Sequence, residues 1–265
     1  KRIRGAYEAG VLTGKKPGYG GSLARTEATG HGLVYFVEEM LREAKLSINN
    51  KTVVVSGSGN VAIYAIEKAQ HFGAKVVACS DSSGYIYDPE GINLKIVKQL
   101  KEVEGKRIKE YVNYRPNALY TEGCDGIWTI PCDIALPCAT QNEINGDQAR
   151  TLIANGVKVV AEGANMPSNL DAINEFLASD VLFGPGKAAN AGGVAVSALE
   201  MAQNSGRNYW TFQEVDEKLH GIMKSIFKES SDAAKKYGYE GNLVVGSNIA
   251  GFIKVANGML VEGVY

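Results

Sequence analysis

A glycine-rich turn is the first part of this sequence whose residue types and spacing could do chemistry. Residues 51–81 read KTVVVSGSGNVAIYAIEKAQHFGAKVVACSD. Gly57, Gly59 and Ala62 match the pattern G-x-G-x-x-G/A, in which one glycine makes a tight turn, the next lets the backbone approach a pyrophosphate, and the last small residue lets a helix pack closely on a strand. A helix beginning near Asn60 would direct its free N–H groups and the positive end of its dipole at the same phosphates. We therefore predict a dinucleotide-binding turn.

The acidic residue that ends the second apolar run fits the same interpretation. Asp81 follows Gly57 at the distance where dinucleotide-binding proteins place a carboxylate on a ribose hydroxyl. Such a carboxylate favours NAD, whereas hydroxyls with nearby cations, as at Ser82 and Ser83, accommodate the 2′-phosphate of NADP. These residues are also typical of a simple polar turn. Similar glycine turns occur in S-adenosylmethionine enzymes, so the residues alone leave the identity of the nucleotide open.

Segments with strand and helix character alternate on both sides of this turn. Helical crossovers of this kind join parallel strands and place helices over both faces of the sheet. The strand segments are almost entirely apolar, as expected for strands buried on both faces. We predict an α/β fold with a Rossmann-like, doubly wound parallel sheet. The predicted strands are 52–56, 75–80, 132–139, 157–165 and 181–186, and the helices predicted between them are 61–73, 146–156 and 169–180.

Helical patterns also precede and interrupt this alternation. Apolar residues at helical spacing predict a helix over 27–45, ahead of the first strand. The stretch 84–120 is polar, and we predict it to be helical, with one helix or two over 93–112. This stretch would lie between the second and third strands of the sheet.

The chain after Ala188 has a helical pattern throughout. Helices are predicted over 188–206 and 247–263, and between them Thr211 and Glu214 have the spacing of a capping box ahead of an amphipathic helix. The predicted organisation is a lead-in at 1–24, a nucleotide-binding domain at 25–210, and C-terminal helices at 211–265 that pack on that domain or extend elsewhere.

Charge and cysteine content argue against several other functions. The 265 residues carry a formal net charge of -1, so we expect no nucleic-acid or acidic membrane partner. No apolar run is expected to be long enough to cross a bilayer. The chain begins at Lys1 without a Met, which is compatible with a fragment of a longer protein. The 4 cysteines form no C-x-x-C pair and the 3 histidines are scattered, so we predict no metal site and the reduced thiols of a cytoplasmic protein.

Six long stretches are unusual in composition, at 20–32, 57–62, 133–144, 161–167, 184–204 and 248–260. Together they resemble the hexameric glutamate dehydrogenases. That family interconverts glutamate with 2-oxoglutarate and ammonia by hydride transfer to or from a nicotinamide. The resemblance implies that the catalytic lysine and aspartate belong to an N-terminal domain with no counterpart here. We therefore expect no catalytic residue in this chain, which would be the coenzyme-binding part of a homohexameric enzyme.

The resemblance also implies roles for individual residues. On the substrate side they are Arg25 at the cleft, and Val194 and Ser197 beside the substrate side chain and its distal carboxylate. Gly192 and Gly193 would let a helix start sit close to the bound ring. The residues implied to bind coenzyme are Thr29 and Asn190 at the carboxamide, Asn60 toward the nicotinamide end, Asn165 at the nicotinamide ribose, Ala139 and Thr140 beside the adenosine ribose, and Gly57, Ser58, Gly59, Val61, Asp81 and Ser82.

The same resemblance favours NADP, with NAD kept as the alternative. The segment SDSSG is similar to that of NADP-using members, some of which meet the phosphate with a lysine further along the chain. That position is Glu104 here, and Lys106 and Arg107 are nearby substitutes or part of a solvated helix face.

Two other functions remain possible at this point. A non-catalytic module that senses a dinucleotide would keep the glycine turn and lose the substrate-side residues, yet Arg25, Val194 and Ser197 are present. Leucine and phenylalanine dehydrogenases share the fold, and the stretches KAANAGGVAVS and NIAGFIKVA set them aside.

Overall fold

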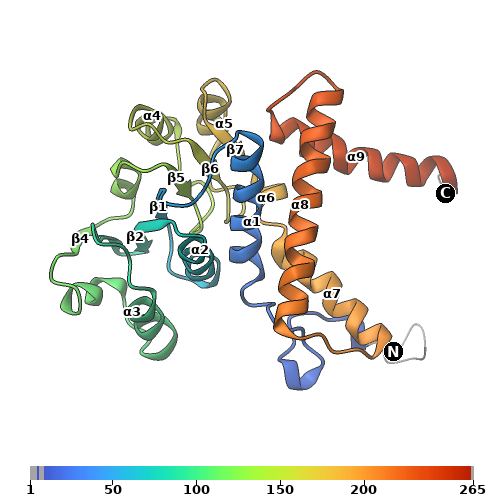
Figure 1. Ribbon diagram of the computed structural model, residues 1–265, viewed down its shortest axis with the longest axis horizontal. Helices are drawn as coiled ribbons and strands as arrows, with labels where there is room; N and C mark the ends of the chain where they lie inside the picture. The colour runs from blue at the N-terminus through green and yellow to red at the C-terminus, as the bar shows by residue number, and fades with distance from the viewer. Residues whose placement is uncertain (1–4, 6–8, 264–265) are drawn as a thin grey trace.

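A seven-stranded sheet forms the centre of the computed structural model, which describes residues 5 and 9–263. Its strand order is β4-β3-β2-β1-β5-β6-β7, and Figure 1 shows it between two layers of helices. Strands β2, β1, β5, β6 and β7 run parallel, whereas β3 pairs antiparallel with both β2 and β4. The predicted doubly wound α/β class is therefore confirmed. The strands are β1 (Thr52–Val55), β2 (Lys75–Asp81), β3 (Gly84–Tyr87), β4 (Leu119–Glu122), β5 (Ile134–Leu136), β6 (Val159–Ala161) and β7 (Leu182–Gly184).

The stretch 84–120 differs from the prediction because both of its ends are strands. Asp81 pairs with Gly84, so Ser82 and Ser83 form the two-residue turn of a β-hairpin. Strand β3 alternates buried and half-buried residues, the pattern of a strand with one covered face. Between β3 and β4 the predicted helical segments are present as α3 (Leu94–Lys98), the π-helical turn η3 (Gln99–Val103) and the 3₁₀ helix η4 (Ile108–Asn113).

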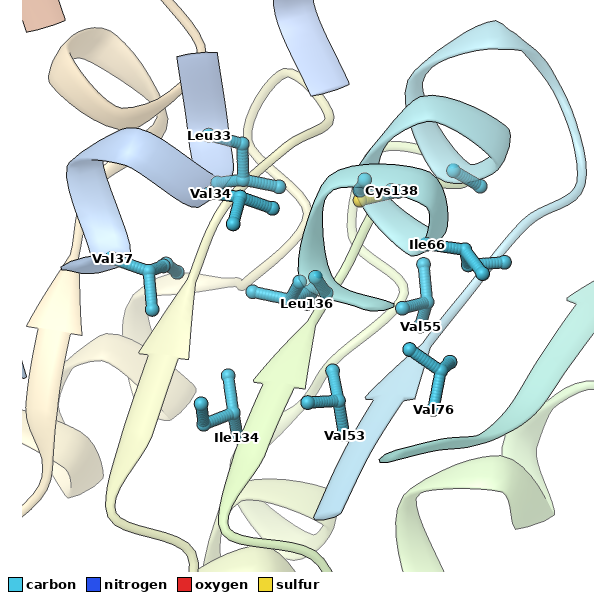
Figure 2. Packing of buried hydrophobic residues seen from close by; sticks show 14 of the residues in the cluster. Leu33, Val34, Val37, Val53, Val55, Ile66, Val76, Ile134, Leu136 and Cys138 are labelled. Atoms are coloured by element: carbon cyan, nitrogen blue, oxygen red, sulfur yellow. The ribbon is translucent and has the colours of Figure 1, made fainter. Parts of the chain in front are cut away.

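Alternation along each central strand divides the core between the two faces of the sheet. Val53 and Val55 of β1 belong to one apolar cluster with α1 (Ala28–Glu43) and α2 (Asn60–His71), and Figure 2 shows both side chains on this face with Ile134 and Leu136 of β5. Val54 points the other way, into a cluster with α4 (Gly146–Ala154), α5 (Leu170–Leu177) and the 3₁₀ helix η5 (Asp125–Thr129). Burial on both faces explains why the buried positions of β1 and β5 are all apolar.

Four helices follow the last strand: α6 (Gly186–Ala189), α7 (Gly192–Gly206), α8 (Phe212–Lys236) and α9 (Leu243–Glu262). The predicted capping box is confirmed, since Thr211 and Glu214 each accept a hydrogen bond from the backbone N–H of the other. Helix α9 begins earlier than predicted because the Asn242 side chain caps it by accepting from the Val245 N–H at 3.0 Å. The division of the chain at 24 and 210 stays a prediction, and part of the lead-in lies outside the described residues.

Helix α9 projects away from the rest of the chain (Figure 1) and is mostly exposed. By length and composition alone it is apolar enough to cross a membrane, with 11% of its most apolar window buried. The expectation that no run reaches this length is therefore wrong for α9. One such helix is weak evidence for a membrane segment, because apolar helices of soluble proteins can meet the same criterion.

A buried polar cluster holds α8 against α1 and α2. Asp216 accepts hydrogen bonds from the Tyr35 hydroxyl at 2.6 Å and Lys68 Nζ at 3.0 Å, and its other oxygen lies 3.0 Å from His31 Nδ1. Burial acts to raise the pKa of Asp216, but the contacts with His31, Tyr35 and Lys68 outweigh it and leave the pKa well below its ordinary value. The folded state therefore favours the charged carboxylate, which fixes the position of α8.

Helices α1 and α7 cross at a pair of glycines. A Cβ on Gly32 would lie 2.8 Å from the Cα of Gly192, and a Cβ on Gly192 would overlap the carbonyl oxygen of Ala28. Gly192 thus serves the close approach of two helices. The small residue is needed on the side facing α1, and the expected closeness of this helix start to a bound ring stays a prediction.

We expect Gly192→Ala to lower the free energy of unfolding by about 1–3 kcal/mol, because its methyl group must push α7 away from α1. Gly221→Ala is the matched control. A Cβ at Gly221 meets nothing within 4 Å, so this change removes an exposed helical glycine and should stabilise by about 0.5–1 kcal/mol. Urea unfolding followed by circular dichroism measures both. Equal effects of the two substitutions would contradict the tight helix crossing.

Candidate functional site

Two adjoining cavities lie beside the carboxyl ends of β1 and β5. We call the first the turn cavity, of about 630 Å³, because the glycine turn lines it. The second, the helix cavity of about 800 Å³, is lined by residues at the starts of α1 and α7. Residues 138–140, which we call the divider, line both cavities. The chain leaves β1 toward β2 on one side while β5 lies on the other, so this is the switch point where open α/β sheets bind ligands.

The glycine turn is shaped to receive a phosphate. Gly57 has a φ of 86°, and a Cβ there would lie 3.1 Å from the carbonyl oxygen of Cys138 in the divider. The Gly57 N–H donates to Ser80 Oγ at 2.7 Å, which joins the ends of β1 and β2. Gly59 precedes α2 and forms no side-chain cap, so the first N–H groups of that helix remain available to an anion.

The carboxylate of Asp81 is turned toward its own loop. One oxygen accepts from the Ser83 N–H at 2.9 Å and from the Ser83 hydroxyl at 2.7 Å, and the other accepts from the Ile108 N–H at 2.9 Å. Lys101 Nζ lies 3.9 Å from it. Burial acts to raise the pKa of Asp81, but these contacts outweigh it and lower the pKa below its ordinary value. Asp81 lines the turn cavity, and both of its carboxylate oxygens accept hydrogen bonds within the protein.

Cationic groups gather at the same end of the turn cavity. Arg107 donates a hydrogen bond to the Ser82 hydroxyl, and both residues line the cavity together with Lys101. Lys106 does not line it and instead pairs with Glu104 at 2.9 Å. Of the two basic substitutes considered from the sequence, the structure therefore brings Arg107 to the cavity. Lys101 was missed because it lies in the π-helical turn, where helical spacing does not indicate which way a side chain faces.

The helix cavity contains the residues expected on the substrate side. Arg25 Nε donates to Ser197 Oγ at 3.0 Å across the start of α7, and Val194 is 70% exposed on the same helix. A Cβ on Gly193 would lie 2.5 Å from Thr29 Oγ1, so the glycine leaves room for that hydroxyl. A cation, a hydroxyl and an apolar side chain thus face one cavity.

Two asparagines that line the helix cavity are hydrogen-bonded to each other. Asn190 Nδ2 donates to Asn165 Oδ1 at 2.9 Å and to the Ala164 carbonyl oxygen at 3.1 Å. Asn60 is exposed at the start of α2 and lines neither cavity, whereas its neighbour Val61 lines the helix cavity. The structure therefore brings all the predicted site residues except Asn60 to the two cavities. In the turn cavity these are Gly57, Ser58, Gly59, Asp81 and Ser82; in the helix cavity Arg25, Thr29, Val61, Asn165, Asn190, Val194 and Ser197; and in both Ala139 and Thr140.

Two acids that the sequence did not single out, the half-buried Glu143 and the buried Glu162, hold the backbone around the site. Glu143 accepts from the N–H groups of Ala139 at 3.0 Å and Thr140 at 3.3 Å. Glu162 accepts from the Gly186 N–H at 2.7 Å, at the start of α6. Burial raises the pKa of both carboxyls above the ordinary value, despite these hydrogen bonds. No periodicity or motif indicated either residue, because their partners are backbone groups of neighbouring loops.

A metal site finds no support in the described part of the chain. Within residues 5 and 9–263 there is no group of three or more His, Cys, Asp or Glu side chains that could hold a metal ion. The donors present at the cavities are instead backbone N–H groups, amides, hydroxyls and cations. These groups suit phosphates, ribose hydroxyls and a carboxamide.

Comparison with known proteins identifies relatives over almost the whole chain. The profile of the Glutamate/Leucine/Phenylalanine/Valine dehydrogenase family matches residues 20–263. The chain is 53% identical to the NADP-specific glutamate dehydrogenase of Helicobacter pylori and 54% identical to the NAD(P)-specific glutamate dehydrogenase of Xylanibacter ruminicola, covering 100% and 97% of this chain. The crystal structure of Plasmodium falciparum glutamate dehydrogenase superposes with a TM-score of 0.95 at 48% identity, over 100% of this chain and 57% of that one.

The chain spans 60% of the Helicobacter pylori protein and 58% of the Xylanibacter ruminicola protein. The alignments therefore cover all or nearly all of this sequence but only part of each relative.

Proposed function

This chain belongs to the Glutamate/Leucine/Phenylalanine/Valine dehydrogenase family, and we propose that it is the coenzyme-binding part of an NADP-linked glutamate dehydrogenase. The full protein would catalyse the reversible oxidative deamination of glutamate to 2-oxoglutarate and ammonia and would assemble as a homohexamer. The observation that carries this proposal is the meeting of the turn cavity and the helix cavity at one divider. One cavity has groups suited to phosphates and the other has groups suited to a carboxamide and a carboxylate.

A dinucleotide would lie across the divider with its pyrophosphate at the start of α2. Its adenosine end would occupy the turn cavity, beside Ala139 and Thr140. Its nicotinamide end would occupy the helix cavity, where Asn190 and Thr29 would hold the carboxamide and Asn165 the ribose. The pair Asn165–Asn190 supports this orientation, because each amide fixes the direction in which the other presents its free donor or acceptor.

The nicotinamide, when bound, supplies the hydride chemistry. The residues of this chain would orient the two reactants. Arg25, held by Ser197, would present its guanidinium to a carboxylate of glutamate, and Val194 would contact the aliphatic part of the substrate. No residue of this chain is assigned proton transfer, because the resemblance places the catalytic lysine and aspartate in another domain.

NADP is favoured over NAD by the geometry at the adenosine end. The Asp81 carboxylate is engaged by Ser83 and Ile108, which leaves it poorly placed to bond a ribose 2′-hydroxyl. Ser82 and Arg107 face the turn cavity instead, and a guanidinium beside a hydroxyl suits a phosphate. NAD remains the alternative, since Asp81 still lines the cavity. A dinucleotide-sensing module is less well supported, because such a module binds no substrate and would not require the Arg25–Ser197 pair.

We expect the 265-residue chain to bind NADPH more tightly than NADH and not to oxidise glutamate. Calorimetric titration with each coenzyme, together with an absorbance assay for NADPH formation, measures both properties. Negligible heat with both coenzymes would refute the binding function. A preference for NADH would establish the NAD alternative, and turnover of glutamate by this chain would refute the assignment of the catalytic residues to another domain.

Arg107→Ala should weaken NADPH binding about tenfold and leave NADH binding unchanged, because a hydrogen bond to a charged group contributes about 1.5–3 kcal/mol and every 1.4 kcal/mol is tenfold in affinity. Lys106→Ala is the matched control. Lys106 is the adjacent cation but pairs with Glu104 outside the turn cavity, so its removal should change neither affinity by more than a small factor. Equal losses for NADPH and NADH in the Arg107 variant would contradict a 2′-phosphate contact.

A further inference from the structure

Glu143 occupies the crevice between the ends of β1 and β5. Its Oε1 accepts two of the three divider N–H groups, from Ala139 at 3.0 Å and Thr140 at 3.3 Å. The Ser56 hydroxyl, directly after β1, acts on the pKa of this carboxyl as a nearby donor and accepts from the Cys138 N–H at 2.8 Å. Glu143 thus links the residue before the glycine turn to the whole divider.

This carboxylate has no cationic partner among the residues that the structure describes. The charged and titratable groups that share the turn cavity with it are Asp81, Lys101, Arg107, Cys124, Asp125 and Cys138. The two cations there are turned toward other groups, Lys101 toward Asp81 and Arg107 toward Ser82. Glu162 acts on Glu143 as a second negative charge.

Burial is therefore the largest single influence on the pKa of Glu143. Removal from water disfavours the charged form of a carboxyl, and only hydrogen bonds from Ser56, Ala139 and Thr140 oppose this effect. The pKa of Glu143 is raised above its ordinary value, first by burial and then by Glu162. A further negative charge in the same cavity would raise it again, since like charges disfavour the ionised form.

We propose that Glu143 is a positioning residue for the coenzyme and takes up a proton when the dinucleotide binds. The proton comes from solvent and adds to the oxygen of Glu143 that does not accept the divider N–H groups. The protonated carboxyl then donates to Ser56 Oγ, which keeps its bond from Cys138, while the other oxygen keeps the N–H groups of Ala139 and Thr140. The divider is held in the same place, and the negative charge beside the incoming phosphates is removed.

This inference depends on the proposed coenzyme-binding function and adds a pH dependence to it. The bound state would have the higher Glu143 pKa, so it binds more protons than the free state in the pH range between the two pKa values. Coenzyme affinity must then rise as pH falls through that range and level off on either side of it.

The test is calorimetric titration of the 265-residue chain with NADPH over a pH series, at each pH in two buffers with different ionisation enthalpies. The wild-type heat should depend on the buffer in the direction of proton uptake. Glu143→Gln keeps an oxygen for the divider N–H groups and an N–H for Ser56, and it should bind NADPH with this uptake abolished. Asp125→Asn is the control, because Asp125 lines the same cavity but is exposed, and it should retain the uptake. The 2′-phosphate titrates equally with all three proteins and cancels in the comparison.

Equal proton uptake by wild type and Glu143→Gln would overturn the role of Glu143 and leave the binding function intact, whereas no heat with wild type would refute the binding function itself. The affinity of wild type for NADH over a pH series tests the inference without a variant, should Glu143→Gln not fold. NADH has no 2′-phosphate, so its affinity should rise as pH falls, and an affinity independent of pH would also overturn the inference.

Discussion

The carboxyl ends of two parallel strands, β1 and β5, present backbone N–H groups at a crevice from which the chain departs in opposite directions. Those groups must be satisfied without filling the space that a ligand needs. Glu143 accepts the hydrogen bonds of Ala139 and Thr140 in the divider, and Ser80 accepts that of Gly57 in the glycine turn. The shape of the turn cavity and its border with the helix cavity both follow from these contacts.

The helix cavity depends on packing farther from the sheet. Its substrate-side pair joins Arg25, just before α1, to Ser197 in α7. These two helices cross at Gly32 and Gly192. The Asp216 cluster fixes α8 against α1 and α2 and so closes the same group of helices. A separation of α1 from α7 would therefore change the Arg25–Ser197 contact without any change in the sheet.

Features encoded by local pattern were predictable from the sequence, and features that depend on distant partners were not. The glycine turn and the apolar parallel strands could be predicted because backbone conformation and burial on two faces each restrict which residues can occur there. Strands β3 and β4 were missed because each is only four residues long and lies beside polar helical segments. The inward turn of the Asp81 carboxylate depends on Ile108, and the role of Glu143 depends on loop N–H groups, so neither leaves a signal in spacing.

The central claim is that the two cavities form one dinucleotide site across the divider, with the 2′-phosphate at Ser82 and Arg107. A crystal structure of the chain bound to NADPH tests this most directly. We predict density for the pyrophosphate against residues 57–60, for the 2′-phosphate against Ser82 and Arg107, and for the nicotinamide in the helix cavity between Thr29 and Asn190. A coenzyme that occupies only one cavity, or that lies elsewhere on the chain, would contradict this account.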